Sequence, residues 1–275
     1  MLGPREVAEL LTAHGLDARR SLGQNFVVDP GTVEHIAALA GVGPDDHVVE
    51  VGPGLGSLTL ALAATGASVV AVEKDRQLLP VLESVLESRG ADLVEVVEAD
   101  ALDLDWSELL GSRSTGEWAL VANLPYNVAV PILMSILERA PQVGRAVVMV
   151  QKEVAERLVA GPGGRTVGIP SIRVAWWARA EILGTVDPEV FVPRPRVTSA
   201  LVGITRHAPP RDDVDPTAVL ELAATAYRQR RKMLRSTIGS IVSADEFERA
   251  GIDPQLRPEQ LSVADWADLQ AARRR

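Results

Sequence analysis

The 275-residue sequence predicts an α/β fold with a mostly parallel sheet, followed by a small all-helical domain. Short apolar segments rich in β-branched residues alternate with helical patterns over the first 150 residues, and this alternation is typical of a parallel sheet. A glycine-rich turn, Gly52 to Gly56, joins a buried strand directly to a helix. After Arg206 only helical periodicity continues, which indicates a second domain.

The elements follow in chain order. Residues 5–14 predict a short helix, a second helix follows Pro30, and a third covers residues 57–64. The expected strands lie near residues 47–51, 68–72, 93–97, 118–122 and 146–150, with a further strand at 200–205. The proline-rich stretch 207–216 is typical of a linker. We therefore expect one domain at residues 1–206 and a helical domain at residues 207–275.

Composition narrows the class of protein. Hydrophobic residues make up 47% of the chain, as in ordinary globular proteins, and cysteine is absent, which excludes disulfides and thiolate chemistry. The four histidines show no metal-ligand spacing, so no metal is expected. Because no apolar run approaches the ~18 residues of a membrane span, we expect a cytoplasmic protein without membrane contact. We also expect a monomer.

The charge is unevenly distributed along the chain. Residues 1–191 hold 14 basic and 26 acidic residues, a net charge of −12, whereas residues 192–275 hold 14 basic and 11 acidic, a net charge of +3. A helix predicted from Pro216 to about Ile241 gathers four cations on one stripe, Arg228, Arg231, Lys232 and Arg235. This stripe suits the phosphates of a nucleic acid, although a solvated helix face has the same pattern.

The segment Asn123-Leu124-Pro125-Tyr126 carries the strongest chemical signal. The Asn123 amide oxygen and the Leu124 carbonyl can accept hydrogen bonds from one amino group, because Pro125 has no N–H and restricts the backbone. Tyr126 offers a flat face on which a nucleobase can stack. The four residues predict a pocket for N-methylation of adenine or cytosine, while a strand end followed by a proline turn is the structural alternative.

Three further positions follow predicted strands. The turn has the spacing G-x-G-x-G and not the G-x-G-x-x-G of dinucleotide enzymes, which favours a ligand without phosphate. Glu73 lies 21 positions beyond Gly52, where an acid binds ribose hydroxyls, and Asp100 follows the third strand, where it can accept from an adenine amino group. With Asn123, these residues occupy the strand ends at which open α/β sheets bind ligands.

Several motifs together carry a family resemblance: SLGQNF at 21–26, VEVGPGLGSLT at 49–59, EKD at 73–75, Asp100, NLPYN at 123–127, MVQKEVAERL at 149–158, FVPRPRV at 191–197 with Ser199-Ala200, and RRKML at 230–234. The sequence resembles the KsgA-type ribosomal RNA small-subunit adenine dimethyltransferases over nearly its whole length. It departs from the family pattern at Ala122, Val167 and Thr198, where Gly, Tyr and Asp are usual.

The resemblance implies a Rossmann-like methyltransferase domain with a seven-stranded, mostly parallel sheet, and S-adenosylmethionine as cofactor. It also implies N6,N6-dimethylation of two adjacent adenines in the 3′-terminal hairpin of 16S ribosomal RNA, within an immature small subunit. The cofactor would contact the residues Asn25, Val27, Gly52, Gly54, Glu73, Asp100 and Asn123. Residues 123–126 would act on the target base, and Phe191 would form a second wall opposite Tyr126.

The sequence alone leaves three alternative functions open. The first is a large-subunit (23S) adenine N6-methyltransferase of the macrolide-resistance (Erm) type, although that group typically has Phe in place of Tyr126. The second is a non-catalytic assembly or transcription factor of the same fold, which would not need chemically suitable cofactor positions. The third is a small-molecule N-methyltransferase, which would not need the cationic stripe.

Overall fold

The computed structural model describes residues 1–18, 23–114 and 116–273. Ser21 and Leu22 of the SLGQNF motif, and the C-terminal residues Arg274 and Arg275, therefore lie outside the described residues.

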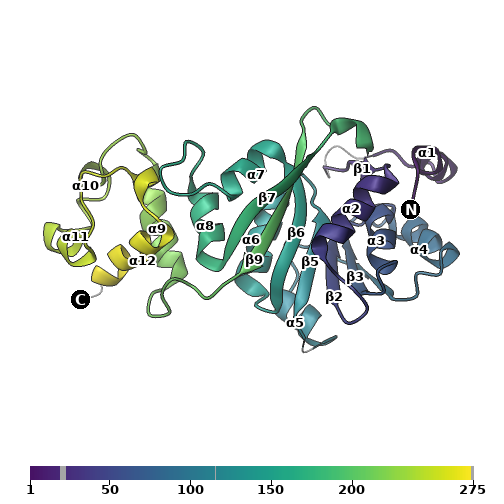
Figure 1. The fold of residues 1–275 in the computed structure, drawn as a ribbon, viewed down its shortest axis with the longest axis horizontal. Coiled ribbons are helices and arrows are strands. Elements are labelled where there is room, and N and C mark those ends of the chain that lie inside the picture. Colours follow the sequence, from purple (N-terminus) through teal and green to yellow (C-terminus); the bar gives the residue numbers. More distant parts are fainter. Residues whose placement is uncertain (19–22, 115, 274–275) are drawn as a thin grey trace. The chain divides into compact units, whose positions relative to one another are not determined.

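A seven-stranded sheet forms the centre of the fold, with the strand order β4-β3-β2-β5-β6-β9-β7 (Figure 1). Its strands are β2 (His47–Val51), β3 (Ser68–Glu73), β4 (Val94–Glu98), β5 (Trp118–Asn123), β6 (Val143–Gln151), β7 (Ala178–Val186) and β9 (Ser199–Arg206). The first five pair in parallel, and β9 is antiparallel to β6. The predicted fold class is confirmed. Strand β7 lies outside the strand ranges that the sequence predicts.

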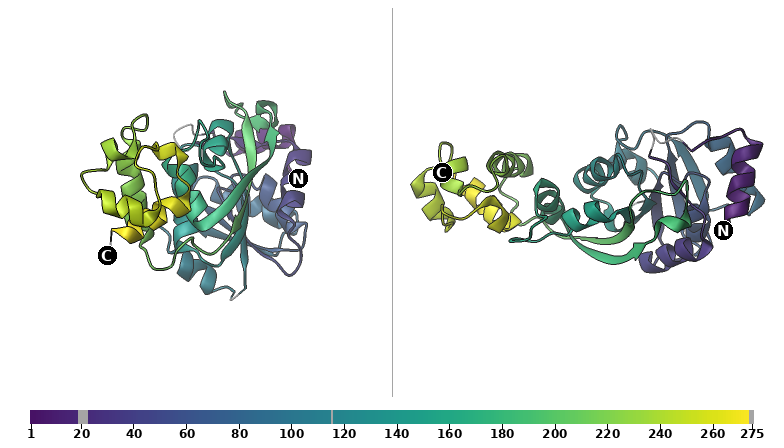
Figure 2. Two further views of the ribbon diagram at one scale, coloured as in Figure 1. Left: turned by 60° about the vertical axis from the view of Figure 1, so that its left-hand side comes forward. Right: turned by 90° about the horizontal axis from the view of Figure 1, so that it is seen from above.

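Helices cover the sheet because the parallel strands are apolar on both faces. The helices of this part are α1 (Pro4–Ala13), α2 (Pro30–Ala40), α3 (Ser57–Ala63), α4 (Leu79–Ser88), α5 (Trp106–Gly111), α6 (Ala129–Arg139) and α7 (Lys152–Leu158). Local chemistry sets their ends. Asp29 caps α2 by accepting a hydrogen bond from the Thr32 N–H at 2.8 Å, and Gly41 ends it in the left-handed region. Figure 2 shows the helices on both sides of the sheet.

A second, two-stranded sheet joins segments that are far apart in the sequence. Strand β1 (Phe26–Val27) is antiparallel to β8 (Phe191–Val192), with Val27 opposite Phe191. A short 3-10 helix, Pro188–Val190, precedes β8. The N-terminal segment is thereby fixed against the segment that leads into β9.

The chain divides into two compact units. The sheet unit comprises residues 1–155 and 181–205, and the helical unit comprises residues 156–180 and 206–275. The helical unit contains α8 (Ile169–Trp177), α9 (Pro216–Tyr227), α10 (Leu234–Thr237), α11 (Ala244–Ala250), the 3-10 helix Pro258–Gln260 and α12 (Val263–Ala272). Residues 156–180, which the sequence predicts to be part of the first domain, are grouped by their contacts with the C-terminal part.

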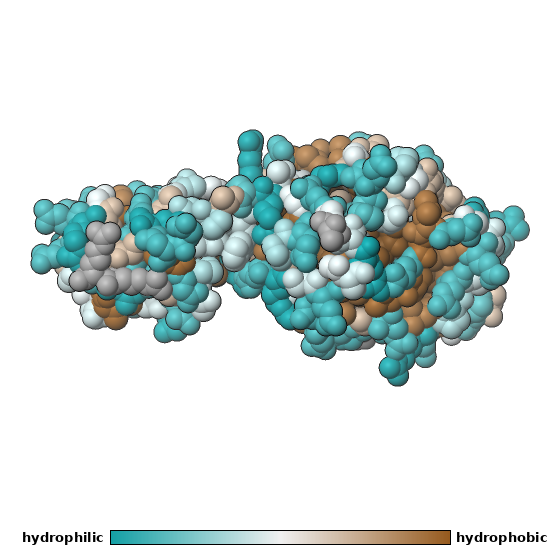
Figure 3. All heavy atoms as spheres, turned by 90° about the horizontal axis from the view of Figure 1, so that it is seen from below, coloured by the Kyte–Doolittle hydropathy of each residue, from teal (hydrophilic) through white to brown (hydrophobic). Residues whose placement is uncertain are grey.

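The helical unit has a hydrophobic core of its own. Trp176 from α8 and Trp266 from α12 are buried in it together with apolar residues of α9 and α10. The unit is mostly hydrophilic on the face that Figure 3 shows, whereas the sheet unit displays a broad apolar area on that face. None of the helices in the described parts of the chain has the length and apolar character needed to cross a bilayer.

The prediction of one helix from Pro216 to about Ile241 is wrong. Helix α9 ends at Tyr227, and turns follow until α10 begins at Leu234. The N–H of Leu234 donates to the Leu256 carbonyl at 2.8 Å and that of Arg235 to the Pro254 carbonyl at 2.9 Å, so contacts with residues 254–256 replace the helical ladder. We call residues 228–235, which include the first two residues of α10, the basic loop. Its cations are exposed but do not form one helical stripe.

Candidate active site

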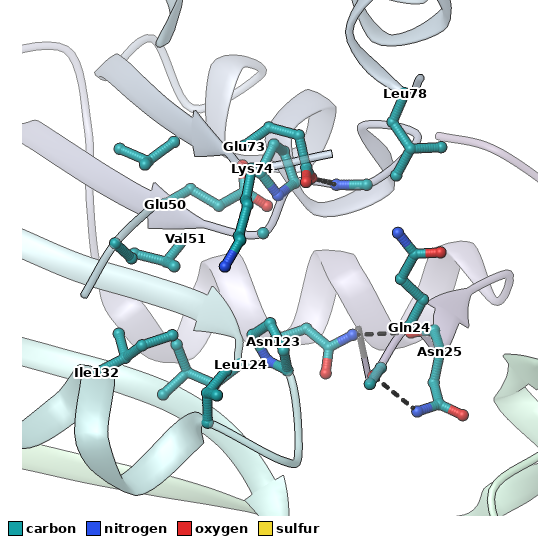
Figure 4. A pocket seen from close by; sticks show the side chains of 18 of the residues that line it. Gln24, Asn25, Glu50, Val51, Glu73, Lys74, Leu78, Asn123, Leu124 and Ile132 are labelled. Carbon is teal, nitrogen blue, oxygen red and sulfur yellow. Dashed lines mark hydrogen bonds between the residues drawn. The ribbon is translucent and has the colours of Figure 1, made fainter. Parts of the chain in front are cut away.

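A cavity of about 200 Å³ lies at the carboxyl ends of β2, β3, β4 and β5. Ten of the residues that sequence analysis predicted for cofactor or target base line this cavity: Asn25, Val27, Gly52, Gly54, Glu73, Asp100, Asn123, Leu124, Pro125 and Tyr126. They come together because the carboxyl ends of parallel strands meet at one edge of the sheet. Figure 4 shows several of them around the cavity.

The glycine-rich turn brings the backbone close to the cavity. Gly52 and Gly54 have φ of +73° and +60°, a region that other residues adopt only with strain. A Cβ on Gly54 would lie 2.9 Å from Cδ1 of Phe26. Glycine is therefore required there both by the backbone conformation and by the close approach of an aromatic ring.

Glu73, at the end of β3, is buried and held by two backbone donors. Its Oε2 accepts from the Gly54 N–H at 3.1 Å, and its Oε1 accepts from the Asp75 N–H at 2.7 Å. Burial raises the pKa of Glu73 above its ordinary value. Because a carboxylate has about four acceptor positions, both oxygens keep capacity for ligand hydroxyls.

Glu50 is a second buried carboxyl at this edge, and the sequence analysis missed it. It lines the cavity from β2, and its Oε2 has no hydrogen-bond partner within residues 1–18, 23–114 and 116–273. Burial, followed by the nearby charge of Glu73, raises the pKa of Glu50 to about 8. An acidic residue inside the apolar strand HVVEV, directly before the glycine turn, was the available signal.

Asp100 follows β4 and is paired with a lysine. Its Oδ2 accepts a short hydrogen bond from Lys74 Nζ, and its Oδ1 accepts from the Leu102 N–H at 3.0 Å. The hydrogen bond from Lys74 holds the pKa of Asp100 below its ordinary value. Asp100 is thus an ionised acceptor at the cavity, and Lys74 is a neighbour that the sequence analysis did not include.

Asn123 has a defined amide orientation at the end of β5. Its Nδ2 donates to the main-chain carbonyl of Asn25 at 3.0 Å, as the dashed line in Figure 4 shows. Its Oδ1 is buried and has no hydrogen-bond partner among the described residues. The side chain of Asn25 donates in turn to the Gly23 carbonyl at 3.1 Å. The amide of Asn123 therefore presents a buried, unbonded acceptor oxygen at the cavity.

Two aromatic residues of the predicted target-base site have different environments. Tyr126 is half-buried, lines the cavity, and forms a short hydrogen bond between its hydroxyl and Ser199 Oγ. Phe191 is only 2% exposed and packs in the hydrophobic core with Val186 and Leu201. It is absent from the cavity lining, and strand β8 pairs with β1 so that Phe191 lies opposite Val27. The wall opposite Tyr126 that the resemblance implies for Phe191 stays a prediction.

The predicted RNA-contacting cations lie in the helical unit. Arg228, Arg231, Lys232 and Arg235 are exposed in the basic loop. Arg230 belongs to the same loop, and its guanidinium donates to the Arg165 carbonyl at 3.0 Å. Among the described residues no cluster of three or more His, Asp or Glu side chains is arranged to hold a metal ion.

Comparisons with known proteins agree with this geometry. The family model of ribosomal RNA adenine dimethylases matches residues 15–272. The chain belongs to this family. A ribosomal RNA small subunit methyltransferase A from Kineococcus radiotolerans is 49% identical over 280 residues, which cover 99% of this chain and 92% of that protein. The same-named protein of Cutibacterium acnes is 46% identical, with 97% and 92% coverage.

Solved structures share the fold of this family member at lower identity. A dimethyladenosine transferase from Plasmodium falciparum aligns with a TM-score of 0.75 at 21% identity, covering 88% of this chain and 94% of that one. The 23S rRNA methyltransferase ErmE aligns with a TM-score of 0.66 at 24% identity, covering 91% and 100%. At these identities the likeness shows a common fold and does not distinguish between the two RNA targets.

Proposed function

We propose that this adenine dimethylase transfers methyl groups from S-adenosylmethionine to N6 of two adjacent adenines in the 3′-terminal hairpin of small-subunit ribosomal RNA. The identities of 49% and 46% to proteins named for the small subunit support this target over the large subunit. The proposal includes a cytoplasmic, monomeric enzyme that acts on an immature small subunit.

The orientation of Asn123 is the observation that carries the proposal. Its Nδ2 is committed to the Asn25 carbonyl, so its buried Oδ1 is the amide atom left to accept from a ligand. An exocyclic amino group has two N–H donors and would satisfy this oxygen. Since a buried acceptor without a partner costs about 1–3 kcal/mol, the site favours a base that carries such a group.

The cavity residues fit S-adenosylmethionine. Gly52 and Gly54 leave backbone without Cβ atoms at the cavity wall, and Glu73 keeps acceptor capacity for ribose hydroxyls. Asp100 would hold the adenine amino group, and Asn25 with Val27 would contact the methionine end. When bound, the cofactor supplies a methyl group on a sulfonium, which makes the transfer a direct displacement.

The chain's part in the reaction is to orient the amine. The Asn123 Oδ1 and the Leu124 carbonyl would each accept one N6–H, which turns the nitrogen lone pair away from the ring system. Tyr126 would stack on the base and hold it in place. No general base is required during transfer, because the N6 proton becomes acidic only afterwards and leaves to water. Positioning of this kind supplies up to about 7–11 kcal/mol in favourable models.

The basic loop would contact phosphates of the subunit RNA. Residues 1–191 carry a net charge of −12, which opposes non-specific RNA binding, whereas residues 192–275 carry +3. We therefore expect binding to need a structured target that meets the exposed cations of residues 228–235.

The test is methyl incorporation into naked small-subunit RNA, immature small subunits and large subunits at one salt concentration. Dimethyladenine should form in the small subunit and much less in its naked RNA. Mapping should place it at two adjacent adenines of the 3′-terminal hairpin. Labelling mainly in the large subunit would instead assign the resistance-type activity, and no labelling of any RNA would contradict both.

A further inference from the structure

One contact of the candidate active site links the ends of two strands. The hydroxyl of Tyr126, which follows β5, is hydrogen-bonded to Ser199 Oγ at the start of β9. Strand β6 lies between these two strands in the sheet. The Tyr126 ring is therefore held at both ends, by its own backbone and by its hydroxyl.

Ser199 is a fixed anchor. It is fully buried, at 0% exposure, and pairs with Gln151 in the antiparallel β6–β9 ladder. Next to it, the Lys152 N–H donates to the Thr198 carbonyl at 3.0 Å, which extends the ladder by one bond. The backbone that carries the Ser199 hydroxyl is thus held on both sides, whereas Tyr126 lies in a turn.

We propose that Ser199 is a positioning residue that fixes where the Tyr126 ring lies for stacking on the target base. This inference rests on the proposed function. The hydroxyl oxygen lies on the χ2 axis, so its bond to Ser199 restrains the χ1 rotamer and thereby the direction in which the ring extends from the turn. Fixing this direction before the base arrives removes part of the ordering cost of binding. A phenylalanine at position 126 would lack this anchor.

Kinetics give the first part of the test. Ser199→Ala and Tyr126→Phe should each lower kcat/KM for small-subunit RNA by about 3- to 10-fold, mostly through KM, which is the effect expected from losing one hydrogen bond. The affinity for S-adenosylmethionine should stay unchanged. The double variant should be no worse than either single variant, because both act through the same bond.

The chain offers a direct probe of the ring, since it contains only two tyrosines. Protein labelled with 3-fluorotyrosine should show two 19F resonances, and Tyr126→Phe assigns one of them. Ser199→Ala should narrow and shift the Tyr126 resonance because the ring gains motion, and the Tyr227 resonance should not move. Ser135→Ala is the matched control, because Ser135 Oγ on α6 is also buried but has no partner among the described residues.

The two readouts separate the two proposals. If Ser199→Ala leaves the Tyr126 resonance and the KM for RNA unchanged, Ser199 does not position the ring. If the double variant regains wild-type KM together with wild-type stability, the bond has a structural role only. If the wild-type protein methylates no RNA, the proposed function fails, while the 19F spectra still decide whether Ser199 fixes the ring.

Discussion

The substitution Gly54→Ala tests how closely the glycine turn and the N-terminal segment approach each other. Gly54 has φ +60°, and an added Cβ would lie 2.9 Å from Cδ1 and 3.0 Å from Cε1 of Phe26. Gly41 is a matched control in the same protein. It has φ +59° at the end of α2, and an added Cβ there meets nothing within 4 Å.

The expected magnitudes follow from this difference. Placing alanine in the left-handed region costs about 1–2 kcal/mol at either position. Gly54→Ala adds overpacking of about 1–3 kcal/mol, because Phe26 is buried among Leu55 and Leu78 and cannot move freely. The free energy of unfolding should therefore fall by about 2–5 kcal/mol for Gly54→Ala and by about 1–2 kcal/mol for Gly41→Ala.

Urea denaturation measures the difference in the free energy of unfolding. Calorimetric titration with S-adenosylmethionine measures the difference in cofactor affinity. The Gly54 N–H donates to Glu73 Oε2, so displacement of the turn should also lower cofactor affinity at least tenfold. Gly41→Ala should leave the affinity unchanged. Equal destabilisation by the two variants, or unchanged cofactor affinity in Gly54→Ala, would refute the close-approach argument.

Three further predictions concern the candidate active site and the basic loop. Asn123→Ala should lower kcat by about 100-fold or more with little change in cofactor affinity, because its acceptor acts on the reacting amine; single-turnover methylation measures this. Burial raises the pKa of Glu50 from 4.5 to about 8. Between pH 4.5 and about 8 the folded state therefore binds one proton more than the unfolded state. The contribution of this proton to the free energy of unfolding is lost as the pH rises through about 8. In urea titrations, Glu50→Gln should reduce the fall in the free energy of unfolding between pH 6 and 9. Glu246→Gln is the control, because the pKa of Glu246 is lowered, and it should leave this fall unchanged. Replacing the four predicted cations of the basic loop by Gln should weaken binding to small subunits and reduce its salt dependence, with cofactor affinity unchanged.

The hydrophobic pattern was sufficient to predict that four of the cavity-lining residues lie together. Gly52, Glu73, Asp100 and Asn123 each lie at or just after the carboxyl end of a strand, and parallel strands bring such positions to one edge. This inference needs only the hydrophobic pattern and the order of the strands. For the same reason the five parallel strands were located to within a few residues.

The features that were missed depend on tertiary contacts. Helix α9 ends at Tyr227, and the N–H groups of Leu234 and Arg235 bond to carbonyls of residues 254–256, which the local pattern does not reveal. Phe191 is a core residue because β8 pairs with β1, across more than 160 residues of chain. The burial of Glu50 likewise results from the helices and strands around β2.

The orientation of the Asn123 amide depends on the N-terminal segment, in which Gly23 lies close to the turn after β5. The amide is oriented by a main-chain carbonyl, that of Asn25, so no side-chain substitution at position 25 removes the acceptor directly. What places this carbonyl is the path of the N-terminal segment over the turn after β5. Gly23 has φ +68°, and a Cβ there would lie 2.5 Å from Asn127 Oδ1 and 3.2 Å from the Tyr126 backbone nitrogen. A side chain at position 23 would therefore require the Asn127 side chain to move and would crowd the Tyr126 backbone. Gly23 of the SLGQNF motif, 100 positions before Asn123, thus permits the close approach by which the Asn25 carbonyl orients the Asn123 amide.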